Sequence, residues 1–177
     1  HALYDASNNA VSRDRVVGPP QHLQWVAEPQ NARHHETLAS VSVAVSAGGR
    51  LFSIVDEAPV ASVLLPPQWR LVARDAFNGV LLWKRPITTW QPHLGEAQNG
   101  PPGLSRRLVA HGNRVYVTLG LTAPLTALNA ATGQTIATYE GTEATEEILF
   151  RDGVLYLVVG GPAVEDRSLR SKAVMAI

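Results

Sequence analysis

The sequence predicts an all-β fold in which four-stranded antiparallel units repeat along the chain. Short apolar segments with alternating side chains are separated by turn residues, and no window keeps the 3.6-residue apolar spacing of a helix over a useful length. A pattern at residues 71–83 also returns about fifty residues later, at residues 125–137. Four-stranded repeats of roughly 40–50 residues are typical of a β-propeller, here an incomplete ring. An immunoglobulin-like sandwich is the alternative, but it does not predict a motif that occurs twice.

The composition is that of a globular protein. The chain has 177 residues, of which 45% are hydrophobic and 17% charged, enough for a core and one domain. Lys and Arg number 15, as do Asp and Glu, so the formal net charge of +0 does not indicate a basic nucleic-acid footprint. No apolar run approaches membrane-spanning length. The absence of cysteine excludes a disulfide framework, a cysteine nucleophile and thiolate metal sites.

Both ends of the chain favour a segment of a longer polypeptide or a processed product. The chain opens at His1 with no initiator and no signal-peptide pattern, and it stops at Ile177 within an expected strand. We expect residues 1–40 to form an extended lead-in and a partial blade. Residues 41–177 should form about three repeats, the last one unfinished, in one domain with the lead-in.

Turn residues punctuate the lead-in at Asn8-Asn9 and Gly18-Pro19-Pro20, and proline removes a backbone donor. We therefore expect an extended segment there rather than a helix. A short strand over residues 22–26 and a polar loop over residues 30–36 should follow.

The first unit begins with a predicted hairpin whose strands are residues 41–46 and 51–55. Residues 59–68 have the character of an insertion, and the motif at residues 71–83 supplies the last two strands. Asn78-Gly79 is the turn signal of this motif, because both residues tolerate the positive φ that a two-residue hairpin turn requires.

A long loop over residues 88–105 separates the first two units, and loops of this length are often functional or mobile. The second unit has expected strands at residues 108–110 and 114–118, followed by the second copy of the motif. The third unit restarts at residues 148–150 and continues over residues 154–159. The last residues of the chain fall where the next strand of that unit should begin.

The two copies of the motif share three types of residue at matched positions. These are an alanine, an Asp or Asn, and a glycine: Ala73, Asp75 and Gly79 in the first copy, and Ala127, Asn129 and Gly133 in the second. Asp and Asn side chains commonly accept hydrogen bonds from backbone donors of an adjacent turn. We therefore expect structural rather than catalytic roles for Asp75 and Asn129.

The first motif, Ala73-x-Asp75-x-x-Asn78-Gly79-x-x-x-Trp83, resembles the repeat of the quinoprotein-type propellers. These form the pyrroloquinoline quinone (PQQ)-like repeat superfamily, which also contains outer-membrane assembly lipoproteins. The resemblance implies that the tryptophan stacks between the alanine of its own blade and the glycine turn of a neighbouring blade. The matched positions of both copies would then be blade-docking residues. The second copy departs from the family at Ala137, where tryptophan is expected, so that contact would be weak or made by other residues.

The lead-in from Asp5 to Trp25 is also similar to the start of the propeller in bacterial PQQ-binding-like proteins. Those proteins are often exported and built from several domains. The resemblance therefore implies a periplasmic or otherwise extracytoplasmic location. It also implies that the partners are the remaining blades of a parent polypeptide or a second copy of the chain, with a further protein partner as a possibility.

A short cluster of histidines is the part of the sequence that most resembles a metal site. His34-His35-Glu36 contains good ligand types, but neighbouring residues of an extended segment point to opposite faces. One strand therefore does not aim both imidazoles at one ion without a bend. We keep Arg33, His34 and His35 as candidate ligand contacts, with surface or loop-packing roles as the simpler interpretation.

Other patterns associated with catalysis are absent from the sequence or have simpler explanations. Glu143, Glu146 and Glu147 form an acidic cluster in an expected loop, but no calcium-loop pattern surrounds it, so we expect a solvated face. The sequence contains neither Gly-x-Ser-x-Gly nor a glycine-rich phosphate loop.

All four tryptophans are expected in core or blade packing rather than in a ligand cage: Trp25, Trp69, Trp83 and Trp90. Because Trp90 lies in the long loop, we expect it to contribute less stability than Trp83.

Two functional classes remain open. The first is a non-catalytic propeller segment that acts as a scaffold or protein-interaction surface in a larger bacterial protein, without a cofactor. The alternative is part of a PQQ-dependent (quinoprotein) dehydrogenase, with PQQ and calcium. By resemblance, such enzymes hold PQQ with a vicinal cysteine pair and calcium with Glu, Asn and Asp. The cysteine pair is absent here and no calcium set can be matched, so we favour the scaffold.

Overall fold

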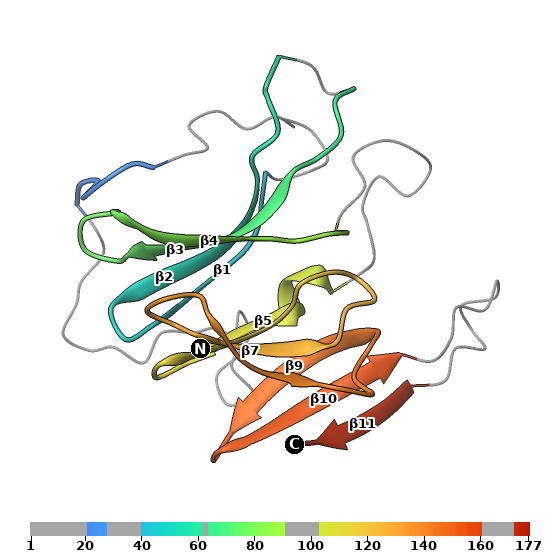
Figure 1. Ribbon diagram of the computed structural model, residues 1–177. Coiled ribbons are helices and arrows are strands. Elements are labelled where there is room, and N and C mark those ends of the chain that lie inside the picture. The colour runs from blue at the N-terminus through green and yellow to red at the C-terminus, as the bar shows by residue number, and fades with distance from the viewer. Residues whose placement is uncertain (1–20, 28–39, 62–63, 91–102, 161–171) are drawn as a thin grey trace.

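The computed structural model describes residues 21–27, 40–61, 64–90, 103–160 and 172–177. Within these residues the chain is all-β, with one 3-10 helix, η1 (Leu104–Arg107), as its sole helical element. The strands form three antiparallel sheets that follow one another along the sequence. They lie side by side in the same order, with the second sheet between the other two (Figure 1).

The first sheet contains β1 (Val41–Ala47), β2 (Arg50–Asp56), β3 (Trp69–Asp75) and β4 (Leu81–Pro86), in that spatial order. Each strand pairs with the next in the chain, as expected for a meander. The alternation predicted for residues 41–46 is reflected in burial, because Val43 and Val45 are buried while their neighbours are not.

The second sheet repeats this arrangement. It contains β5 (Leu108–His111), β6 (Arg114–Thr118), β7 (Leu125–Asn129) and β8 (Thr135–Tyr139), again in chain order. Helix η1 immediately precedes β5.

The third sheet has three strands among the residues that the structure describes. These are β9 (Thr145–Arg151), β10 (Val154–Gly160) and β11 (Lys172–Ala176), with β10 in the centre and β11 at one edge. By order and pairing, β11 takes the place that β3 and β7 hold in the other sheets.

The repeat is most visible in strand register. In every sheet the second and third strands pair an aromatic residue with an alanine: Phe52 with Ala73, Tyr116 with Ala127, and Tyr156 with Ala176. Paired residues of an antiparallel ladder project to the same side. We call the side that carries this aromatic residue the forward face of each sheet.

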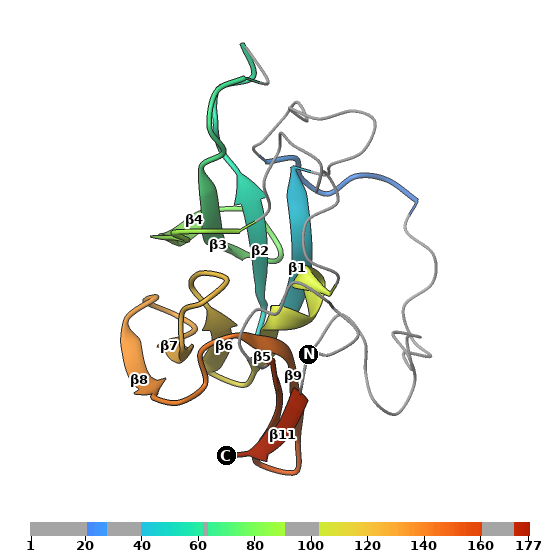
Figure 2. The same cartoon turned by 90° about the vertical axis from the view of Figure 1, so that its right-hand side faces the viewer.

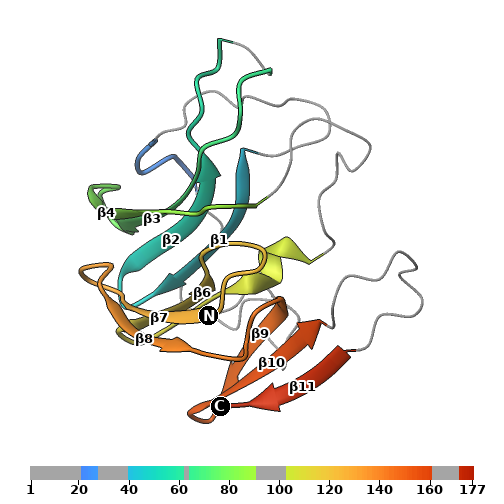
Figure 3. The same ribbon diagram turned by 45° about the vertical axis from the view of Figure 1, so that its right-hand side comes forward.

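Two hydrophobic clusters join the sheets. The first lies between the forward face of the first sheet and the second sheet, and it includes Phe52, Leu71, Leu108 and Val115. The second lies between the forward face of the second sheet and the third sheet, and it includes Leu125, Ile148 and Leu157. Figures 2 and 3 show the resulting stack of three sheets from two further directions.

The turn between β3 and β4 differs from the predicted two-residue type. Asp75 N–H donates to Val80 O at 2.9 Å, and Gly79 N–H donates to Asp75 O at 2.9 Å, which leaves residues 76–79 in the loop. Gly79 has a φ of 73°, but Asn78 is not among the described residues with positive φ. The expectation that Asn78 and Gly79 both adopt positive φ is therefore wrong.

One other expectation needs correction, and one is confirmed. Residues 21–27 contain no strand, so the short strand predicted over residues 22–26 is not formed. Trp90 is only 3% exposed and its Nε1–H donates to Ser42 Oγ at 3.0 Å. The packing role expected for Trp90 is therefore confirmed, because its indole lies in the first hydrophobic cluster. Its position in a loop gives no reason to expect a smaller contribution to stability than that of Trp83.

No helix in the part of the chain that the structure describes is long and apolar enough to cross a membrane.

Candidate interaction site

Trp83 joins the first sheet to the second. It lies in β4 opposite Ala73, so its indole projects from the forward face. The indole Nε1–H donates to Ala130 O at 3.0 Å. The ring lies so close to Gly133 that a Cβ atom added there would be 2.6 Å from Trp83 Cδ2. Glycine is required at this position, because a side chain would occupy the space of the indole and the backbone has a φ of 71°.

Arg85 strengthens the same junction. It lies two residues beyond Trp83 in β4 and therefore projects to the same side. Its guanidinium donates to Gly133 O at 2.7 Å, and it approaches Thr135 Oγ1 at 3.4 Å. The turn between β7 and β8 is thus held by one buried aromatic side chain and one cation.

A second indole makes the same contact on the first sheet. Trp25 Nε1–H donates to Ala76 O at 3.0 Å, and a Cβ atom added at Gly79 would be 2.6 Å from Trp25 Cε3. Ala76 precedes Gly79 by three residues, as Ala130 precedes Gly133. The two tryptophans therefore meet equivalent carbonyl and glycine positions in successive units.

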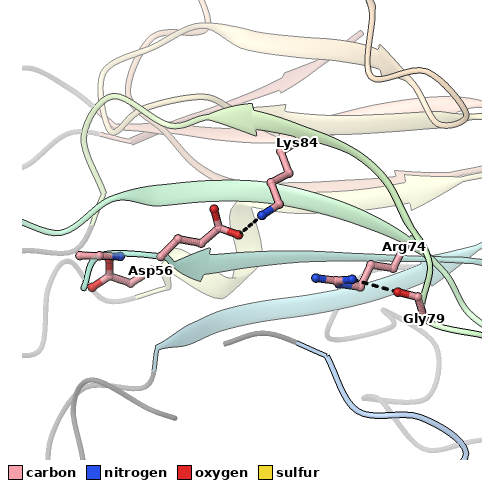
Figure 4. Close-up of polar contacts among 6 residues, drawn as sticks. Asp56, Arg74, Gly79 and Lys84 are labelled. Carbon is pink, nitrogen blue, oxygen red and sulfur yellow. Dashed lines mark hydrogen bonds and ion pairs between the residues drawn. The ribbon is translucent and has the colours of Figure 1, made fainter. Parts of the chain in front are cut away.

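Neighbouring side chains fix the turn that receives Trp25. Gln24 Nε2 donates to Phe77 O at 2.6 Å. The guanidinium of Arg74 donates to Gly79 O at 2.9 Å, as Figure 4 shows. Figure 4 also draws the ion pair in which Lys84 Nζ lies 2.5 Å from a carboxylate oxygen of Glu57.

Asp75 and Asn129 act on the turns, as the sequence predicts. Asp75 Oδ1 accepts hydrogen bonds from the backbone N–H groups of Phe77 and Asn78, at 2.8 and 3.1 Å. Asn129 Oδ1 accepts the corresponding bonds from Ala131 and Thr132, at 2.9 and 3.1 Å. These bonds stabilise the two turns that contact the indoles of Trp25 and Trp83.

Three contributors to these junctions were not identified from the sequence. The sequence predicts a packing role for Trp25 but no partner for it, and it predicts no role for Ala76 or Ala130. Each alanine accepts an indole N–H at its carbonyl, while its own N–H donates to the preceding hairpin turn at Gly49 O or Asn113 O, at 2.9 and 3.0 Å. Backbone carbonyls carry no residue-specific signal, but the recurrence of alanine directly after Asp75 and Asn129 was visible in the sequence.

The junction between the second and third sheets lacks an indole at the matched position. Ala137 lies opposite Ala127 in register, where Trp83 lies opposite Ala73. Ala137 is partly buried and packs against the second hydrophobic cluster. Here the aromatic contact comes from Tyr116 and Phe150, whose rings stack with centroids 5.9 Å apart.

The forward face of the third sheet is uncovered by any described residue. Tyr156 is 42% exposed, whereas the equivalent Phe52 and Tyr116 are 0% and 4% exposed. Val174 is 76% exposed and pairs with Val158, in the place where Leu71 of the first sheet is 0% exposed. The face that contacts a following sheet in the first two units is therefore open in the third.

Within the described residues, the remaining sequence candidates form no site. Arg33, His34 and His35 lie outside the described residues. Glu146 and Glu147 lie in β9 rather than in a loop, and Glu147 accepts a hydrogen bond from Arg106 at 3.1 Å. The described parts of the chain contain no group of three or more His, Cys, Asp or Glu residues that could hold a metal ion.

Comparison with protein-family models and with curated proteins finds no match to this chain.

Proposed function

We propose that the chain is a segment of a β-propeller that acts as a non-catalytic scaffold and protein-interaction surface within a larger extracytoplasmic bacterial protein. The observation that carries the interaction role is the open forward face of the third sheet, around Tyr156 and Val174. The bacterial and extracytoplasmic setting comes from the family resemblance alone.

Three features of the sheets support a propeller over a sandwich. The sheets are meanders that stack in chain order, whereas a sandwich has two layers joined by Greek-key connections. The first strands of successive sheets lie together, β1 against β5 and β5 against β9, as the inner strands of blades do. The indole–glycine contact also recurs at equivalent positions of successive units.

The motif residues support a structural rather than a catalytic role. Asp75 and Asn129 use their side-chain oxygens to accept backbone hydrogen bonds. The only polar side-chain atom of Trp83, Nε1, donates its hydrogen bond to Ala130 O. These groups contact the turns and the junctions between sheets, so their proposed role is to hold the sheets together.

Static light scattering of the isolated chain tests the interaction role. An exposed apolar sheet face favours association, so the mean mass of the wild-type chain should rise with protein concentration. Val174→Lys places a charge on the open face and should reduce this rise. Val60→Lys is the matched control, because Val60 is also exposed but lies in the insertion between β2 and β3.

A wild-type chain that stays monomeric and thermally stable at high concentration would contradict the proposal. Equal effects of Val174→Lys and Val60→Lys would also contradict it, because association would then not depend on the forward face.

A further inference from the structure

Two turns of the molecule receive an indole from another part of the chain. We call residues 76–79 the first turn and residues 130–133 the second turn. Trp25 contacts the first turn and Trp83 contacts the second. In each turn the ring lies against a glycine of positive φ. The two junctions use the same aromatic contact, so selectivity between them must come from other groups.

The guanidinium at each turn comes from a different side of the junction. At the second turn, Arg85 belongs to β4, the strand that also carries the indole, and it donates to Gly133 O at 2.7 Å. At the first turn, Arg74 belongs to β3, which leads into the turn itself, and it donates to Gly79 O at 2.9 Å. The arginine is thus supplied by the docking segment in one case and by the receiving sheet in the other.

The matched positions in the sequence are complementary. Leu128 stands in the second sheet where Arg74 stands in the first, directly after the motif alanine. It is fully buried, and its side chain has no polar atom that could donate to a carbonyl. Ala27 stands two residues after its indole, as Arg85 does. Arginine on the receiving sheet is therefore combined with alanine on the docking segment, and leucine on the receiving sheet with arginine on the docking segment.

Exchanging the two docking segments would disturb this balance of charge. If β4 docked on the first turn, Arg85 would come close to Arg74 beside one carbonyl, and two like charges at short range repel each other. If residues 21–27 docked on the second turn, Gly133 O would lose its guanidinium, because neither matched residue can supply one. Each segment therefore fits the turn on which the structure places it better than it fits the other.

We propose that Arg74 is a specificity residue, which reserves the first turn for residues 21–27 and disfavours docking segments that carry their own arginine, such as β4 of a second copy. Gln24 contributes to the same choice, because its Nε2 donates to Phe77 O at 2.6 Å and the matched residue of β4 is Leu82. The position of the arginine would then set the order in which segments stack. The inference goes beyond the proposed interaction role and does not depend on the open face of the third sheet.

Hydrogen exchange of the Trp25 indole N–H, followed by NMR on the full chain, reports how often residues 21–27 leave the first turn. Ala27→Arg adds an arginine at the position where β4 carries one. In the wild-type background it should speed this exchange about threefold, because Arg74 repels the added guanidinium. In an Arg74→Leu background the same substitution should slow the exchange about threefold, because the added arginine then supplies the donor for Gly79 O.

Val26→Arg is the matched control, because Val26 is 71% exposed and lies next to Ala27. It adds the same charge at a position that does not match Arg85, so its effect should not change sign between the two backgrounds. The indole N–H of Trp83 reports whether each variant keeps its fold, because its acceptor lies at the second turn. Its exchange should be the same in all variants.

The proposal is overturned if Ala27→Arg changes the exchange of Trp25 in the same direction in both backgrounds, or leaves it unchanged in either. It is also overturned if Val26→Arg shows the same reversal of sign. An Arg74→Ala background should repeat the reversal, since it also leaves Gly79 O without this guanidinium. A wild-type chain that does not self-associate would count against the proposed open-face interaction but not against this inference.

Discussion

Trp83 combines the burial of a large indole with one hydrogen bond across the junction between two sheets. Trp83→Ala should lower the free energy of unfolding by about 3–5 kcal/mol, as large-to-small core substitutions do. Trp90→Ala should have an effect of similar size, because Trp90 is also buried and hydrogen-bonded. Urea denaturation measures both, with Phe77→Ala at an exposed turn position as the control. Small and equal losses in all three variants would show that neither indole is part of the core.

Gly133 and Gly112 form a matched pair that separates backbone strain from crowding. Both have positive φ, but a Cβ atom at Gly112 would meet nothing within 4 Å, whereas one at Gly133 would meet Trp83. Gly112→Ala should cost about 1–2 kcal/mol, from backbone strain alone. Gly133→Ala should cost a further 1–3 kcal/mol or so, because the indole must move.

A double-mutant cycle checks the source of this excess. In a Trp83→Ala background, the cost of Gly133→Ala should fall to that of Gly112→Ala. An excess that persists without the indole would contradict the crowding argument.

Asp and Asn have the same function at the two turns, which is to accept backbone hydrogen bonds. Asp75→Asn should leave the free energy of unfolding nearly unchanged, because Asn129 accepts the equivalent pair of backbone hydrogen bonds in the second sheet. Asp75→Ala should cost about 0.5–2 kcal/mol, since two backbone donors lose their acceptor, as at a helix N-cap. Chemical denaturation compares the two variants. A larger loss for Asp75→Asn than for Asp75→Ala would indicate a role for the charge that the turn geometry does not explain.

Hairpins were the easiest elements to predict, because the alternation of apolar and polar residues and the glycine-containing turns are local signals. The hairpin of β5 and β6, with its turn after His111, follows the prediction within a residue. Strand β11 forms at the last residues of the chain, where the next strand of the third unit was expected. The pairing of Ala176 with Tyr156 could not be predicted, because it is a tertiary property.

Among the residues at the junctions between sheets, some could also be predicted from local sequence and others could not. The docking role of Trp83 was implied by the resemblance of residues 73–83 to the quinoprotein-type repeat, and that motif is complete within a short stretch. The partner of Trp25 lies 51 residues away, a separation that local periodicity does not report. The length of the turn at residues 76–79 was missed because Asn-Gly favours short turns, whereas the Asp75 side chain stabilises a longer one.

For the molecule as a whole, we expect no tight binding of PQQ or calcium. Cysteine is absent from the chain, and no set of calcium ligands can be matched in its sequence. Calorimetric titration with PQQ plus calcium should therefore give no saturable heat in the micromolar range, where binding is worth about −8 kcal/mol. A one-to-one isotherm would instead favour the quinoprotein alternative.

Ala137 stands in the place of a docking tryptophan, so the two junctions of the stack should differ in stability. Repeat proteins derive stability from each unit and from its contacts with adjacent units, so a weaker junction divides the chain into cooperative blocks. The first two sheets share an indole clamp, while the third is joined without one. Under heat or tension the third sheet should therefore unfold first, and the first two sheets should remain as the last folded block.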